Sequence, residues 1–258
     1  MSPLPSLDLI NIAEVTPEFV KTHYFHGIDL TDSEGNEVPE DSFNYHLASA
    51  KAWLRNKIGI ELEPVVISEE PHDYRLTEFM SAYGHFNLRR SPIIEVTDLA
   101  FWYGSTRYFA FPQSWLRVHD RKGTVQIFPA PVASGANLAI GQDGQLIIPT
   151  LYARAYAPQM FRITYTAGFK EGMVPANIID CICKKASIEI FNQLGDIIVG
   201  AGIANISLSL DGLSQSVGTT ASATNAGYGA RIIQYEKQLK ALVEELRGTY
   251  KGVVMGVG

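Results

Sequence analysis

The stretch that decides the fold is residues 161–217, FRITYTAGFKEGMVPANIIDCICKKASIEIFNQLGDIIVGAGIANISLSLDGLSQSV. It opens as a strand, because Phe161, Ile163 and Tyr165 alternate with polar residues in the period of two that a half-buried strand shows. Gly168 and the glycine four residues later break this pattern. We therefore predict a strand that ends before Gly168.

A helix is predicted to follow this strand. Pro175 stands where a first helical residue belongs, since its missing N–H would be unpaired there in any case. Gly195 is the kind of residue that ends a helix, so the predicted helix covers residues 175–194. Its apolar face consists of Ile179, Ile182, Ala186 and Ile190.

A glycine-rich bridge then leads into a predicted hairpin within residues 196–217. Ile206, Leu208 and Leu210 alternate with polar residues, which favours a strand. Asp211 and Gly212 form a preferred two-residue hairpin turn, and residues 213–217 can form the returning strand.

Two more helices are predicted on either side of this stretch. The first covers residues 41–59, with Asp41 or Ser42 as its cap and Gly59 at its end. Its apolar stripe consists of Phe43, Leu47, Ala50, Leu54 and Ile58. The second covers residues 229–248 and carries a heptad seam made of Ile232, Tyr235, Leu239, Leu242 and Leu246.

The heptad seam has two interpretations. It completes the subunit's own core, in which case polar residues at Leu239 and Leu242 unfold the protein, or it docks on another molecule. We expect docking, because the uncharged residues 218–229 would let the helix leave its own subunit. In that case the double replacement leaves a folded monomer that does not assemble.

Between residues 62 and 168 the pattern changes to short segments rich in aromatic and branched residues, separated by Gly, Pro, Asn and Asp. This spacing favours a small antiparallel sheet, sandwich or barrel. The aromatic runs 101–103 and 108–111 could form a platform for a carbohydrate or a peptide. Burial in a core or interface explains them better, since burying each large apolar side chain is worth about 1.5–3 kcal/mol.

The charge of the chain is concentrated at one end. The net charge is −6, and residues 1–50 hold nine acidic residues and one basic residue, Lys21. A protein that grips duplex DNA would instead show a basic stripe, so we expect no tight DNA binding. There is no apolar run of membrane-spanning length and no signal peptide at the start, which favours synthesis in the cytoplasm and no membrane partner.

The motifs of common catalytic sites are missing from the sequence. Residues 212–216 fail the Gly-x-Ser-x-Gly pattern at the last position, and no Walker loop or dinucleotide fingerprint is present. The six histidines are scattered, and Cys181 and Cys183 point to opposite sides of their predicted helix. We therefore predict no catalytic, cofactor-binding or metal-binding residue, and a protein that is not an enzyme.

Three pieces of sequence resemble a known family. They are Tyr-Thr-Ala-Gly-Phe at 165–169, Val-Pro-Ala at 174–176 before an apolar helix, and Ser-Leu-Asp-Gly-Leu-Ser at 209–214. The combination is similar to the head–tail connector proteins (adaptor, or head-completion, proteins) of tailed phages, and residues 46–60 resemble the first helix of that family. The C-terminal third carries most of the resemblance.

The resemblance implies a small helical bundle with a β-hairpin loop. Connectors of this family place little between their first helix and the Tyr-Thr-Ala-Gly strand, so the chain departs from the family there. We interpret its aromatic-rich block as an inserted antiparallel β-domain, which gives an α+β fold. The predicted parts are an acidic N-terminal arm (1–40), a connector-like helical core (41–60 and 161–248), the β-rich insertion (61–160) and a C-terminal tail (249–258).

The resemblance also implies a structural virion protein of the phage neck, synthesised in the host cytoplasm and needing no cofactor. It would form a ring of identical subunits, a dodecamer if the family's symmetry holds, between the portal protein and the next neck or tail protein. Double-stranded DNA would pass through the lumen during ejection without specific binding. The residues expected at the subunit or portal interface are Ile206, Leu208, Leu210, Ile232, Tyr235, Leu239, Leu242 and Leu246. The alternative is a β-rich tail or baseplate module that recognises a glycan or a protein.

Overall fold

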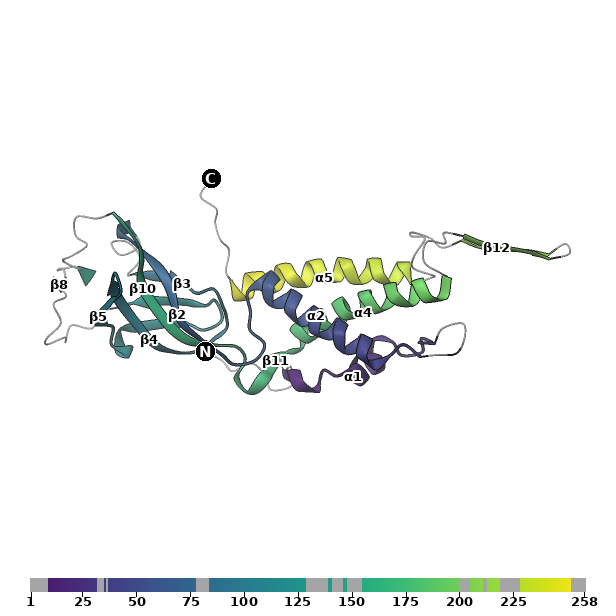
Figure 1. Cartoon of the computed structure of the whole chain (residues 1–258), viewed down its shortest axis with the longest axis horizontal. Helices are drawn as coiled ribbons and strands as arrows, with labels where there is room; N and C mark the ends of the chain where they lie inside the picture. Colours follow the sequence, from purple (N-terminus) through teal and green to yellow (C-terminus); the bar gives the residue numbers. More distant parts are fainter. Residues whose placement is uncertain are drawn as a thin grey trace. The chain divides into compact units, whose positions relative to one another are not determined.

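The computed structural model describes residues 9–31, 35, 37–77, 84–128, 139–140, 146–147, 155–199, 205–210, 213–218 and 228–251. Helices and antiparallel sheets are both present, which confirms the predicted α+β class (Figure 1). The chain divides into two compact units. Met1–Ile58 and Met173–Arg247 form a helical unit, and Gly59–Gly172 with Gly248–Gly258 form a β unit.

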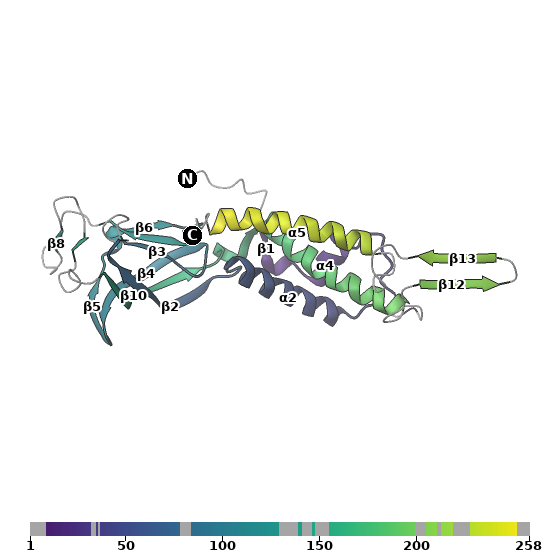
Figure 2. The same ribbon diagram turned by 90° about the horizontal axis from the view of Figure 1, so that it is seen from above.

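The helical unit is built from α1 (Pro17–Tyr24), α2 (Glu40–Ile58), α4 (Ala176–Val199) and α5 (Gly229–Tyr250), the last of which belongs to this unit as far as Arg247. Helices α2, α4 and α5 lie side by side in two perpendicular views (Figures 1 and 2). The predicted stripe of α2 is confirmed, since its five apolar residues are the buried residues of that helix. The stripe faces α4, against which α2 packs.

Helix α4 differs from its prediction at both ends. Pro175 is not its first residue but the last residue of a short strand, β11 (Met173–Pro175), paired with β1 (Leu9–Asn11). Gly195 does not end the helix, which continues to Val199. A single glycine inside a helix costs only about 1 kcal/mol relative to alanine, and packing outweighs that cost here because Gly195 is buried.

The sequence of the N-terminal arm predicts a short helix capped by Thr16 in an otherwise extended segment, whereas the described residues 9–31 fold onto the helical unit. Strand β1 pairs with β11, and α1 packs on α2 and α4. Thr16 caps α1 by accepting a hydrogen bond from the Phe19 N–H at 3.3 Å, with Pro17 at the first helical position. Tyr24 at the other end of α1 donates to Asp180 of α4 at 2.8 Å. Local capping and these contacts hold the segment in place.

The predicted hairpin is confirmed. Strands β12 (Asn205–Leu210) and β13 (Leu213–Gly218) pair antiparallel, with Ile206 opposite Val217 and Leu210 opposite Leu213 (Figure 2). Among the described residues these two strands form a sheet by themselves.

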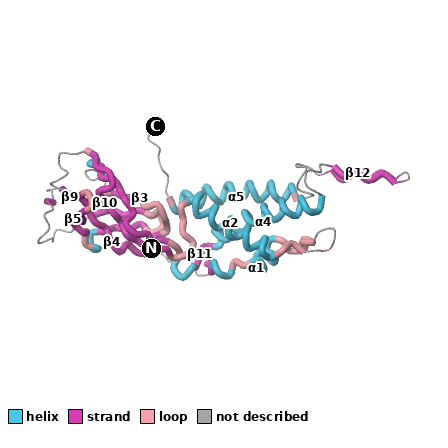
Figure 3. Tube along the Cα trace, viewed as in Figure 1, coloured by secondary structure: helices cyan, strands magenta, loops and turns pink. Residues whose placement is uncertain are grey.

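The β unit contains two main antiparallel sheets, shown in magenta in Figure 3. The first has the order β2 (Val65–Arg75), β10 (Tyr156–Ala167), β4 (Ile93–Tyr103) and β5 (Thr106–Ala110). The second has the order β3 (His85–Asn87), β7 (Thr124–Ile127) and β6 (Leu116–His119). Short 3-10 turns Gln113–Trp115 and Lys170–Gly172 connect elements, and β8 (Ala139–Ile140) pairs with β9 (Leu146–Ile147). The strand 156–167, expected to belong partly to the helical core, is an interior strand of this unit.

One core joins the two sheets, and Phe161 of β10 lies in it. Its ring centroid is 5.0 Å from that of Phe86, 5.6 Å from that of Phe101 and 6.1 Å from that of Phe111. All of these side chains are buried, as is Trp115. Of the aromatic residues that could have formed a carbohydrate platform, Phe101 and Phe111 are buried in this core, Trp102 and Phe109 are half-buried, and Tyr103 and Tyr108 are exposed.

Gly168, which ends β10, sets a steric limit that can be tested. Its φ of +129° is rare for other residues, and an added Cβ would lie 2.2 Å from the Glu63 carbonyl oxygen. We expect Gly168→Ala to destabilise the β unit by about 2 kcal/mol or more, measured by urea denaturation. Gly248→Ala is the matched control, because a Cβ there meets open space in a helix. It should raise stability by about 0.5–1 kcal/mol. Equal effects of the two substitutions would contradict this account.

Candidate functional site

The predicted interface residues fall into two groups in the structure. Ile206, Leu208 and Leu210 lie on β12, in the self-paired hairpin. The other five lie on α5. The two groups are separate elements of the helical unit, and the assignment of both to an interface stays a prediction.

The heptad seam of α5 is largely covered within the subunit. Ile232, Leu239 and Leu246 are buried, and Tyr235 and Leu242 are half-buried. The Tyr235 ring lies 6.3 Å from the ring of Phe191 on α4 and 6.5 Å from that of Tyr24 on α1. Leu239 is buried and contributes to the subunit's own core. Polar residues at Leu239 and Leu242 are therefore expected to destabilise the helical unit itself, and not only to prevent docking.

Part of the seam still borders an accessible groove. Leu239 and Val243 of α5 line a groove of about 500 Å³ together with Trp53 of α2 and Ile188 of α4. Its charged lining residues carry both signs: Lys57, Lys185, Glu189, Glu236, Lys240, Glu244 and Arg247. A partner that docks on α5 would reach the seam here.

Core and surface positions on α5 should respond differently to truncation. Leu246 is 1% exposed, so Leu246→Ala should lower the free energy of unfolding by about 2–5 kcal/mol. Ile233 on the same helix is 40% exposed, and Ile233→Ala should change it by less than about 1 kcal/mol. Thermal and urea denaturation of the two variants measure the difference. A native-like transition for Leu246→Ala would show that α5 leaves the core in the free subunit.

A buried carboxylate organises the β unit, and an irregularity in β2 puts it there. Ile163 of β10 lies opposite Glu70, whereas Tyr165 lies opposite Ile67, so two residues of β2 face one residue of β10. This is a β-bulge, with Glu69 in the left-handed region at φ 50°. The extra residue shifts the alternation, so that Glu70 and Tyr74 point into the core.

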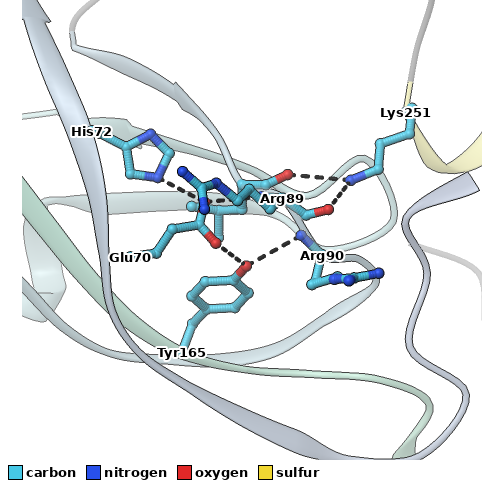
Figure 4. A network of polar contacts seen from close by, with 7 residues as sticks. Glu70, His72, Arg89, Arg90, Tyr165 and Lys251 are labelled. Atoms are coloured by element: carbon cyan, nitrogen blue, oxygen red, sulfur yellow. Dashed lines mark hydrogen bonds and ion pairs between the residues drawn. The ribbon is translucent and has the colours of Figure 1, made fainter. Parts of the chain in front are cut away.

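Several donors surround Glu70 (Figure 4). The Tyr165 hydroxyl donates to its Oε2 at 2.6 Å, and the Arg89 backbone N–H donates to its Oε1 at 3.0 Å. His72 Nε2 lies 3.0 Å from the same Oε1. The Tyr165 hydroxyl in turn accepts from the backbone N–H of Arg90 at 3.2 Å. A charge buried in this way is tolerable only because its oxygens are hydrogen-bonded.

These donors determine the protonation state of Glu70. Burial alone would raise the pKa of its carboxyl group, but hydrogen bonds from His72, Tyr165 and the Arg89 N–H lower the pKa below its ordinary value. Burial and the neighbouring carboxylate raise the pKa of Tyr165. Near neutral pH, Glu70 is therefore an anion and Tyr165 is a neutral donor.

The segment around Arg89 is held from its other side as well. Lys251 Nζ donates to the Leu88 carbonyl at 3.2 Å and to the Arg89 carbonyl at 2.9 Å. Arg90 Nε lies 3.2 Å from Oε1 of the buried Glu61. The polar network thus fixes residues 88–90 by both backbone and side-chain contacts.

This network is better suited to structural support than to catalysis. Glu70 is ionised and saturated with donors, and Tyr165 is fully buried, so neither is placed to exchange a proton with a ligand. The thiols of Cys181 and Cys183 are also buried, and burial raises the pKa of each to about 12, which suppresses the reactive thiolate. No cluster of three or more His, Cys, Asp or Glu residues suited to a metal ion occurs in the described part of the chain.

Sequence reasoning did not find this network. The pattern of β2 is hidden by the bulge, and no motif marks a carboxylate whose partners come from backbone groups.

Across the described residues, no helix has both the length and the apolar character that crossing a membrane requires.

The chain is similar to parts of gene transfer agent particles. It aligns with a chain from the virion of a native gene transfer agent particle at 14% identity and a TM-score of 0.46. It also aligns with a chain from the neck of an empty particle of that kind, at 13% identity and a TM-score of 0.45. Each alignment covers 100% of this chain and 96% of the other. No protein-family model and no curated protein matches the chain.

Glu70 should govern the acid stability of the β unit. A carboxylate with a lowered folded pKa stabilises the fold above its unfolded pKa, and this contribution is lost as the pH falls through the folded pKa. We expect Glu70→Gln to cost about 1.5–3 kcal/mol at neutral pH, because an amide N–H₂ would face donors, and to flatten the acid limb of the stability curve.

Glu69→Gln is the matched control for this substitution. Glu69 is adjacent in the chain, but its side chain is 55% exposed and pairs with Arg162 at 2.8 Å. Such an exposed pair is worth about 0–1 kcal/mol. Urea denaturation from acid to neutral pH compares the two variants. An unchanged acid limb in Glu70→Gln would rule out the proposed role of this carboxylate.

Proposed function

We propose that this protein is a structural subunit of the neck of a tailed phage or a phage-like particle, where it forms a ring between the portal and the tail. Two lines of reasoning support the proposal. The sequence resembles head–tail connector proteins, and the order of strand, apolar helix, hairpin and final helix that the resemblance implies is the order of β10, α4, β12–β13 and α5.

The observation that carries the proposal is the self-paired hairpin β12–β13. An isolated two-stranded hairpin is at best marginally stable in water, because it has no third strand and no core. Each strand also has an outer edge of backbone N–H and C=O groups, and no other described strand pairs with these edges. Such an edge is a template for a strand from another chain.

The composition of the hairpin fits this role. Soluble proteins protect exposed strand edges with lysine, proline or bulges. Residues 205–218 contain neither lysine nor proline, Asp211 is their single charged residue, and the pairing register is continuous. A ring of identical subunits would cover such a surface by repeating one contact around its axis. DNA would pass through the lumen without being gripped, which the acidic net charge of −6 favours.

Substitution on one face of the hairpin tests the proposal. Successive residues of a strand point to opposite faces, so Leu208→Asp and Ser207→Asp place the same charge on different faces of β12. We expect Leu208→Asp to abolish ring formation with the co-expressed portal protein, while Ser207→Asp assembles at least about tenfold better. Sedimentation velocity and negative-stain microscopy measure assembly, and thermal denaturation confirms that both variants are folded.

Two outcomes would contradict parts of this proposal. A wild-type protein that stays monomeric with portal and neck proteins under all tested conditions would refute the ring. Full assembly of Leu208→Asp would refute the role of the hairpin in the ring.

A further inference from the structure

A pocket in the β unit is unexplained by the proposed assembly. It has a volume of about 410 Å³ and is formed by residues from β2, β3 and β10 with Arg89. Its lining residues are Pro71, His72, Asp73, Arg75, His85, Phe86, Asn87, Arg89 and Gln159. The volume lies at the lower end of the range of about 300–1,000 Å³ that is typical of small-molecule sites.

Two arginines dominate the charge of the pocket. Arg75 and Arg89 are both exposed, and neither guanidinium group forms a hydrogen bond or ion pair within the described part of the chain. A guanidinium group carries five N–H donors in a planar fork that matches a carboxylate or a phosphate. Asn87 and Gln159 add side-chain amide donors to the same lining.

The acidic groups near the pocket are already occupied. Asp73 accepts from the Gln159 backbone N–H at its Oδ1 and from the Tyr156 hydroxyl at its Oδ2, each at 3.0 Å. These two bonds lower the pKa of Asp73 and keep it ionised. Glu70, which lies behind His72, has its own donors. The charge of Arg75 also contributes to lowering the pKa of Asp73, but no hydrogen bond of the described residues occupies the guanidinium donors of Arg75 or Arg89.

Glu70 also orients one wall of the pocket. Its Oε1 lies 3.0 Å from Nε2 of His72, and the His72 ring packs edge-on against Phe86 with centroids 5.5 Å apart. Figure 4 shows the second ring nitrogen of His72 turned away from Glu70. A histidine fixed in this way through one nitrogen presents the other to a ligand.

We propose that this pocket is an oxyanion-binding site, which takes a carboxylate or phosphate group of a small acidic ligand or of an acidic group on a partner. Arg75 and Arg89 supply the charge-assisted hydrogen bonds, and His72, positioned by Glu70, supplies a further polar contact. The proposal does not depend on ring formation, since every residue involved belongs to the β unit of one chain.

Calorimetric titration of the full chain tests the site. Sodium phosphate and sodium citrate are the probes, each compared with sodium chloride at equal ionic strength. We expect saturable binding of at least one probe, and a loss of at least about tenfold in affinity for Arg75→Gln and for Arg89→Gln, because each removes a charge-assisted contact. Arg107→Gln is the matched control, since Arg107 pairs with Asp98 and does not line the pocket. Its affinity should equal that of the wild type.

The two probes distinguish the sources of the oxyanion. Binding of phosphate alone supports a phosphate-bearing ligand, and binding of citrate alone supports a carboxylate. Absence of saturable binding with both probes overturns the proposal. So does equal binding by the wild type and the Arg75→Gln/Arg89→Gln double variant. The Arg89→Gln substitution keeps the backbone N–H that donates a hydrogen bond to Glu70. Thermal denaturation confirms that each variant is folded.

Discussion

The β unit depends on strand β10, which is paired along both of its edges. It lies between β2 and β4, and its inward residues Phe161, Ile163 and Tyr165 are fully buried. A strand in this position cannot shift without breaking two ladders and the core, so the Tyr165 hydroxyl is a fixed point. The bulge at Glu69 brings a carboxylate to that point. The backbone N–H groups of Arg89 and Arg90 then bind to this carboxylate–hydroxyl pair, which holds the segment that follows β3.

The energetics of this arrangement explain why a buried charge is retained. An isolated carboxylate in a core would be protonated, because burial disfavours the charged form. Here the hydroxyl and backbone donors come from elements that the fold holds in place, so they cost little further ordering. The result is a rigid polar contact where an apolar pair would leave the Arg89 and Arg90 N–H groups unpaired. Loss of either partner therefore affects the loop as well as the strand.

Regular patterns could be predicted from the sequence, and long-range corrections to them could not. The alternation of β10, the stripe of α2 and the antiparallel pairing of Asn205–Leu210 with Leu213–Gly218 each depend on neighbours in the chain, and each is present in the structure. The local pattern places Pro175 in the helix. Its true position in β11 depends on pairing with β1, a segment far away in the sequence, which no local pattern indicates. The Glu70 site depends on a bulge, and an extra residue in a strand looks like an interruption of its pattern.

The sheets of this chain differ in how their edge strands are protected from pairing with a strand of another molecule. In the four-stranded sheet, the edge strand β2 carries Pro71 and the bulge at Glu69, and the other edge strand, β5, is five residues long and carries Arg107. Proline, bulges, charges and short length are the devices by which soluble proteins prevent edge-to-edge pairing.

The hairpin β12–β13 has a regular register, no proline and no positive charge. The same chain thus protects the edges of one sheet, while no other described strand pairs with the edges of the hairpin. An open edge invites aggregation unless a strand of another chain pairs with it, which is the role proposed above for this hairpin. Sheet edges can therefore direct assembly even in a protein whose larger helices complete their own core.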